Sequence, residues 1–120
     1  MKMKSVVIRT RDITKSIAFY EQVMGFSFDS MISAAPGKQI AFLSDPESCT
    51  SIELLYNENN KEIAPGSVSL TFVVEQIGPA EKYLISKNVR IISSPKTIKD
   101  GKKIMTAVDP NGVELDFIEE

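Results

Sequence analysis

Residues 5–28, SVVIRTRDITKSIAFYEQVMGFSF, predict a strand, a capped helix and the beginning of a second strand. Asp12 is a good N-cap residue for the helix, and Gly25 stands where a helix commonly ends in a left-handed residue. Between these two positions, apolar side chains recur at helical spacing. This stretch therefore predicts one amphipathic helix directly between two strands.

A weaker copy of this pattern returns in residues 67–92, SVSLTFVVEQIGPAEKYLISKNVRII. Three pairs of equivalent residues lie at nearly constant separation: Ser5 and Ser67 are 62 positions apart, Gly25 and Asn88 63, and Glu53 and Asp116 63. Such self-similarity indicates an internal repeat. We expect an α+β protein with one domain over residues 1–120, built from two βαβββ modules at about 1–58 and 66–120 and a polar linker at 59–65.

The other elements follow from strand-like runs bounded by turn residues. Strands are expected at residues 4–10, 26–34, 39–44, 50–57, 67–74, 89–93, 103–108 and 113–119, and helices at 13–24 and 78–87. Asn88 is expected to end the second helix in the way that Gly25 ends the first.

Composition narrows the range of functions. The chain has 120 residues, 42% hydrophobic and 25% charged, with a net charge of −2 and no basic block, which is typical of a globular domain that does not bind nucleic acid. We expect no membrane span and no signal peptide, because the sequence holds no sustained apolar run. The single cysteine, Cys49, is compatible with a reducing cytoplasm.

The chain contains no histidine. This absence excludes a Ser-His-Asp triad, a Cys-His pair and any zinc, nickel or iron site that depends on imidazole. The chain also has no tryptophan, so Phe, Tyr and Met must supply aromatic or soft contacts with a ligand.

Alternation along the first and last strand of each half separates an apolar face from a polar one. The apolar face suits packing against the two helices. The polar face carries Arg9 and, at matching places in the repeat, the carboxylates of Glu53 and Asp116. This face is either the solvated side of an antiparallel sheet or the lining of a cleft.

Three segments resemble the vicinal oxygen chelate superfamily, which includes glyoxalase I, bleomycin-resistance proteins and extradiol dioxygenases. RDITKSIAFYEQVMGF is similar to the first helix of the family, SIELLYN to the strand that ends its first half, and DPNGVELDFIEE to its closing hairpin. The resemblance implies a curved mixed sheet around a cleft, with the helices on the outer face. It also implies a homodimer.

In metal-dependent members of the family, four side chains hold a divalent ion, one from the first and one from the last strand of each half. The positions that match here are Ser5, Glu53, Ser67 and Asp116. Arg9 and Asn57 match positions that resemble glutathione contacts in bacterial glyoxalase I. The resemblance therefore implies that Ser5, Arg9, Asn57 and Ser67 bind a ligand and that Glu53 and Asp116 are the candidate catalytic residues.

In glyoxalase I the positions that match Ser5 and Ser67 typically hold His, or Gln at the second, so the two serines change the expected chemistry. Neutral imidazole binds nickel, zinc and iron strongly, whereas a protonated serine hydroxyl is a poor ligand. We therefore expect no tightly held metal and no cofactor. If an ion binds at all, Glu53 and Asp116 would hold Mg²⁺ or Mn²⁺ weakly, because both ions prefer oxygen ligands.

Three functions remain open at this point. The first is metal-free binding of a small organic ligand in the cleft. The second is a lyase or isomerase of the lactoylglutathione-lyase type with an all-oxygen metal site, in which Glu53 or Asp116 is the base. The third is a structural or regulatory dimer with a vestigial cleft. Extradiol dioxygenase chemistry ranks last, since it needs an iron site with two His residues.

Overall fold

The structure, a computed structural model, describes residues 1–64, 66 and 68–120. The elements in chain order are β1 (Val6–Thr10), α1 (Ile13–Ala18), a π-helical segment (Phe19–Val23), β2 (Ser27–Ala35), β3 (Lys38–Ser44), β4 (Ser51–Asn57), β5 (Ser69–Val74), α2 (Ile77–Ser86), β6 (Arg90–Thr97), a 3-10 turn (Lys99–Gly101), β7 (Lys103–Val108) and β8 (Glu114–Glu119). None of the described helices is long and apolar enough to cross a bilayer.

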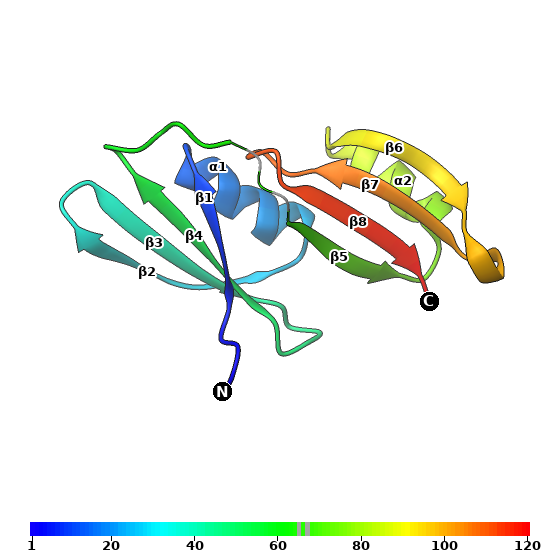
Figure 1. Cartoon of the computed structure of the whole chain (residues 1–120), viewed down its shortest axis with the longest axis horizontal. Coiled ribbons are helices and arrows are strands. Elements are labelled where there is room, and N and C mark those ends of the chain that lie inside the picture. Colours follow the sequence, from blue (N-terminus) through cyan, green and yellow to red (C-terminus); the bar gives the residue numbers. More distant parts are fainter. Residues whose placement is uncertain (65, 67) are drawn as a thin grey trace. The chain divides into compact units, whose positions relative to one another are not determined.

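The chain divides into two compact units, residues 1–64 and 65–120. Each unit contains a four-stranded mixed sheet, with the strand order β1-β4-β3-β2 in unit 1 and β5-β8-β7-β6 in unit 2 (Figure 1). The first and last strand of each unit pair in parallel, and the remaining neighbours pair antiparallel. The α+β class and the two βαβββ modules predicted from the sequence are confirmed.

In unit 1, α1 covers one face of the sheet, where it contacts β3 and β4. The apolar side chains predicted for this face contribute to the core, including Ile8, Ile52 and Leu54, which are buried. Tyr20 is fully buried, and its ring meets the rings of Phe19 and Phe26 edge-on at centroid distances of 5.1 and 5.9 Å. Burying these aromatic rings contributes hydrophobic stabilisation to this unit.

The first helix begins at Ile13 as predicted and ends at Val23, one residue before the predicted end, and its last part is wider than an α-helix. The Asp12 side chain accepts the backbone N–H of Lys15 at 3.0 Å, and Gly25 has a φ of +80°. The N–H of Met24 donates to the Phe19 carbonyl at 3.1 Å, the five-residue spacing of a π-helix. This wider turn accommodates one residue more than the second helix contains.

In unit 2, α2 covers the corresponding face of the sheet, where it contacts β6, β7 and β8. Its side chains Ile77 and Leu84 are buried, and Phe72 stacks on Phe117 with ring centroids 5.6 Å apart. Asn88 has a φ of 60° and ends the helix as predicted. Two bonds of a Schellman motif form there, Asn88 N–H to the Ile85 carbonyl at 3.0 Å and Val89 N–H to the Leu84 carbonyl at 3.0 Å.

Some boundaries differ from the prediction. α2 begins at Ile77, and β6 continues to Thr97 although a strand ending at residue 93 was expected. Pro95 follows the expected end, and proline cannot donate a hydrogen bond to a neighbouring strand. β6 is an edge strand, and its register shifts between Ser93 and Lys96, so Pro95 lies in an irregularity and the strand continues beyond it.

Candidate functional site

Glu53 lies on the face of the unit 1 sheet opposite α1, as predicted. On β4 it stands between Val7 of β1 and Phe42 of β3, which are its direct partners in the strand register. The hydroxyl of Ser5 donates to Oε2 of Glu53. The structure therefore brings together two of the four candidate residues of unit 1, with the Ser5 hydroxyl positioned to orient the Glu53 carboxylate.

The other two candidates of unit 1 lie farther along the same face. Arg9 is exposed and stands beside Leu55 in the register. Asn57 ends β4, and its side-chain oxygen accepts the N–H of Asn59 at 3.0 Å. The amide oxygen of Asn57 thus stabilises the turn after the strand. Ligand binding by Arg9 and Asn57 stays a prediction.

In unit 2, Asp116 of β8 lies between two threonines. Thr71 of β5 is its partner on one side and Thr106 of β7 its partner on the other. The Thr106 hydroxyl donates to Oδ1 of Asp116 at 2.6 Å. Both candidate carboxylates therefore accept a hydrogen bond from a hydroxyl of their own unit. For Glu53 the hydroxyl comes from the chain leading into the parallel neighbour β1, and for Asp116 it comes from the antiparallel neighbour β7.

Thr106 was not among the residues singled out from the sequence. The face assignment was applied only to the first and last strand of each half, and Thr106 is on the third strand of its unit. The same alternation, continued into residues 103–108, would have placed its side chain beside the carboxylate.

Ser67, the predicted counterpart of Ser5, lies outside the described residues. The strand registers indicate a different counterpart. Val7 stands opposite Glu53 and Thr71 opposite Asp116, so the residue two positions before Thr71 occupies the place that Ser5 occupies in unit 1. That residue is Ser69, which is exposed on the described part of β5.

The donor atoms around each carboxylate bear on the divalent metal that the fold family implies. Among the described residues, the Ser5 hydroxyl contacts Glu53 and the Thr106 hydroxyl contacts Asp116, whose other strand partner is Thr71. These are oxygen donors that stay protonated, so they suit neither nickel, zinc nor iron. Glu53 and Asp116 are the residues that could hold a hard ion such as Mg²⁺. The meeting of the two carboxylates in one cleft stays a prediction.

Comparison with known proteins gives concordant matches. The model of the Glyoxalase/Bleomycin resistance protein/Dioxygenase superfamily matches residues 2–117. A lactoylglutathione lyase from Haemophilus influenzae is 26% identical over 125 residues, which cover 99% of this chain and 93% of that protein.

Two crystal structures show the similarity of fold. Glyoxalase I from Zea mays gives a TM-score of 0.83 at 25% identity, over 99% of this chain and 44% of the maize chain. A superfamily member from Sphaerobacter thermophilus gives a TM-score of 0.79 at 19% identity, over 99% of this chain and 98% of that chain.

Proposed function

Because the chain belongs to the Glyoxalase/Bleomycin resistance protein/Dioxygenase superfamily, we propose that it binds a small organic ligand without a tightly held metal. The ligand contacts the sheet faces opposite the helices, where Glu53 and Asp116 lie. The observation that carries this proposal is that each of the two carboxylates accepts a hydrogen bond from a neighbouring hydroxyl. Carboxylates held in this way are oriented acceptors for the donor groups of a ligand.

The surroundings of Glu53 support an organic ligand. Its direct neighbours on the adjacent strands are Val7 and Phe42, and the next residue of β4 on this face is Leu55. Val7 is 46% exposed, although it is a large apolar side chain. A few polar groups among apolar side chains are the usual composition of a site for a small molecule. Arg9 would pair with an anionic group of the ligand or stack on one of its rings.

The test combines metal analysis with a ligand screen. Protein purified without added ions should contain far less than one equivalent of nickel, zinc or iron. A ligand that binds the native state should raise the thermal midpoint with a chelator present, and Glu53→Gln or Asp116→Asn should reduce that rise. A full equivalent of one of these metals, or binding that only a metal supports, would contradict the proposal.

A second candidate function rests on the 26% identity to a lactoylglutathione lyase. In this function a carboxylate moves a proton next to a carbonyl, and Glu53 or Asp116 is the base. A weakly held Mg²⁺ or Mn²⁺ would supply Lewis-acid chemistry when bound. Conversion of lactoylglutathione in the presence of Mn²⁺, lost in Glu53→Gln, would favour the lyase over the binding protein. The homodimer and the cytoplasmic location stay predictions.

A further inference from the structure

The polar face of unit 2 carries a row of hydrogen-bonding side chains that crosses all four strands. The strand register places each member directly beside the next, from β5 through β8 and β7 to β6. The members are Thr71, Asp116, Thr106 and Ser93. We call these four residues the hydroxyl row. Because neighbouring strands are about 4.8 Å apart, the row offers a polar group at roughly that interval along its length.

The corresponding row of unit 1 has different chemistry. In the same four places, the register of β1, β4, β3 and β2 puts Val7, Glu53, Phe42 and Ser30. The carboxylate of unit 1 therefore has apolar neighbours on both adjacent strands, whereas the carboxylate of unit 2 has hydroxyl neighbours on both. The hydroxyl row therefore occurs in unit 2 and is not repeated in unit 1.

An apolar row lies next to the hydroxyl row, two residues along each strand. Val73 of β5 stands beside Ile118 of β8, and Ile118 stands beside Ile104 of β7. Val73 is 61% exposed. The same face thus presents a polar strip beside an apolar strip. A sugar ring has a matching division, because its hydroxyl edges are polar and its C–H face is apolar.

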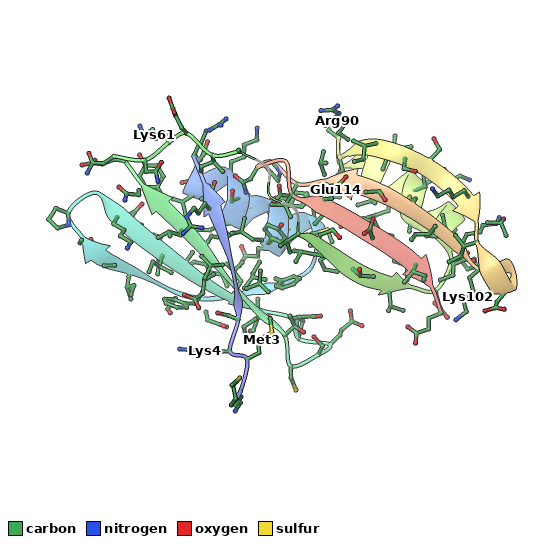
Figure 2. All side chains as sticks on the ribbon, in the orientation of Figure 1. Met3, Lys4, Lys61, Arg90, Lys102 and Glu114 are labelled. Carbon is green, nitrogen blue, oxygen red and sulfur yellow. The ribbon has the colours of Figure 1, made fainter. Side chains whose placement is uncertain are left out.

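The charged member of the hydroxyl row itself is Asp116, which is acidic. On β5, β7 and β8, the described residues that point to this face include two charged side chains, Asp116 and Glu114, and both are acidic. Arg90 and Lys96 belong to the edge strand β6, and Figure 2 shows Arg90 and Glu114 at the same end of the sheet. Because Lys96 stands beside Ile104 and Arg90 beside Val108, the edge strand adds two basic residues to the face. A cationic group centred on Asp116 meets the carboxylate of the row, with these two positive charges on the edge strand.

The hydrogen bond from Thr106 to Asp116 determines which groups of the row donate to a ligand and which accept from it. Thr106 donates to Oδ1 of Asp116, so this hydroxyl holds the carboxylate in place within the row. A carboxylate only accepts hydrogen bonds, whereas Thr71 and Ser93 hydroxyls both donate and accept. A ligand matches this order of donors and acceptors when its ammonium group lies on Asp116 and its hydroxyls lie on the threonines and the serine of the row.

We propose that the hydroxyl row binds an amino sugar or a related amino-alcohol, with the ammonium group on Asp116 and the ring hydroxyls along the row. Thr106 is the positioning residue that orients Asp116. The proposal rests on the proposed function, since it names the class of ligand that the polar face of unit 2 takes.

The experiment uses the full chain labelled with ¹⁵N and three matched probes: glucosamine, N-acetylglucosamine and glucose. Glucosamine should shift the amide signals of the hydroxyl row in a saturable manner. N-acetylglucosamine and glucose, which lack the ammonium group, should bind at least fivefold more weakly. Asp116→Asn should reduce glucosamine binding by a similar factor, because it removes the charge that the ammonium group needs.

The positioning role has its own variants. Thr106→Val keeps the shape of the side chain and removes its hydroxyl, and should weaken glucosamine binding severalfold. Thr106→Ser restores the hydroxyl and should restore most of the binding. The matched control is Ser44→Ala, which removes the exposed hydroxyl that donates to Asp29 at 3.2 Å in unit 1. This control should leave glucosamine binding unchanged.

Equal binding of the three probes, or shifts spread over both units and unaffected by Asp116→Asn, would overturn the assignment of the row. So would unchanged binding in Thr106→Val together with an unchanged amide spectrum. The proposed function fails in a different way, through a full equivalent of tightly bound metal. A ligand from the screen that shifts only signals around Glu53 would therefore uphold the proposed function and overturn the amino-sugar row.

Discussion

The carboxylate of Glu119 accepts the backbone N–H of Ile77 through Oε2 at 2.9 Å, so the last strand of unit 2 caps the beginning of α2. The N-cap residue Gln76 makes no side-chain cap bond within the described structure. The other oxygen of Glu119 accepts the N–H of Lys103, the first residue of β7, at 3.2 Å. One side chain thus joins three elements, whereas in unit 1 the cap comes from Asp12, which directly precedes its helix.

Glu119→Gln should destabilise unit 2 by about 1 kcal/mol, because the substitution removes the charge that strengthens both hydrogen bonds. The measurement is chemical denaturation, together with hydrogen exchange of the first turn of α2. Glu120→Gln removes the same charge at the neighbouring exposed position and serves as the control. If the two variants lose equal stability, net charge and not the cap explains the loss.

Asp12→Ala should cost about 1 kcal/mol, the usual effect of removing an N-cap side chain. The matched variant Asp12→Asn keeps an oxygen that can accept the N–H of Lys15, and should remain close to the wild type in stability. Thermal or urea denaturation separates the two. A large loss in both variants would mean that the charge of Asp12 matters more than its hydrogen bond.

Local signals predicted the ends of the helices well. Asp12, Gly25 and Asn88 have the roles that their residue types favour, because a cap depends on a few adjacent residues. The π-helical segment was not predicted, since one additional residue in a turn leaves the apolar spacing nearly unchanged. The continuation of β6 past Pro95 also depends on tertiary structure, namely on the position of the strand at the edge of its sheet.

The pairing of the repeats was harder to predict, because the two modules differ in length at several turns. Asp45 N–H bonds to the Thr50 carbonyl at 2.9 Å, and Asp109 N–H bonds to the Val113 carbonyl at 3.0 Å, so the first turn holds one more residue than the second. A constant separation counted along the sequence does not correct for these differences in turn length, so it can pair residues that are not equivalent. The strand registers avoid this problem, and they indicate Ser69 as the counterpart of Ser5.

The two turns that begin with Asp45 and Asp109 offer a matched pair of substitutions. Asp109 is 4% exposed, and its Oδ1 accepts the N–H groups of Asn111 and Val113 at 2.7 and 2.8 Å. Asp109→Ala should cost about 2 kcal/mol, because it leaves two part-buried N–H groups without this acceptor. Asp45→Ala should cost less, since the corresponding bonds of Asp45 to Glu47 and Ser48 are exposed. Equal losses in urea denaturation would contradict this reasoning.

The assignment of Ser69 as the counterpart of Ser5 can be tested by substituting histidine at Ser5 and at either Ser69 or Ser67. The family resemblance matches nitrogen ligands to Ser5 and Ser67, whereas the strand register indicates Ser69 in place of Ser67. Imidazole binds zinc and nickel much more strongly than a hydroxyl does. If Glu53 and Asp116 share the cleft predicted from the sequence, Ser5→His combined with Ser69→His should bind about one Zn²⁺ per chain. The double variant that instead carries Ser67→His should bind Zn²⁺ at least tenfold more weakly. Isothermal titration and metal analysis after dialysis provide the measurement.

Two further variants separate the contributions to this site. Ser5→His alone should bind Zn²⁺ weakly, because one imidazole and the Glu53 carboxylate leave the ion short of strong ligands. Adding Asp116→Asn to the double variant should remove most of the gained affinity, since it takes away the charged ligand of unit 2. Tighter binding with Ser67→His than with Ser69→His would reverse the assignment from the strand register. Equal and weak binding in both double variants would instead show that Glu53 and Asp116 do not share one site.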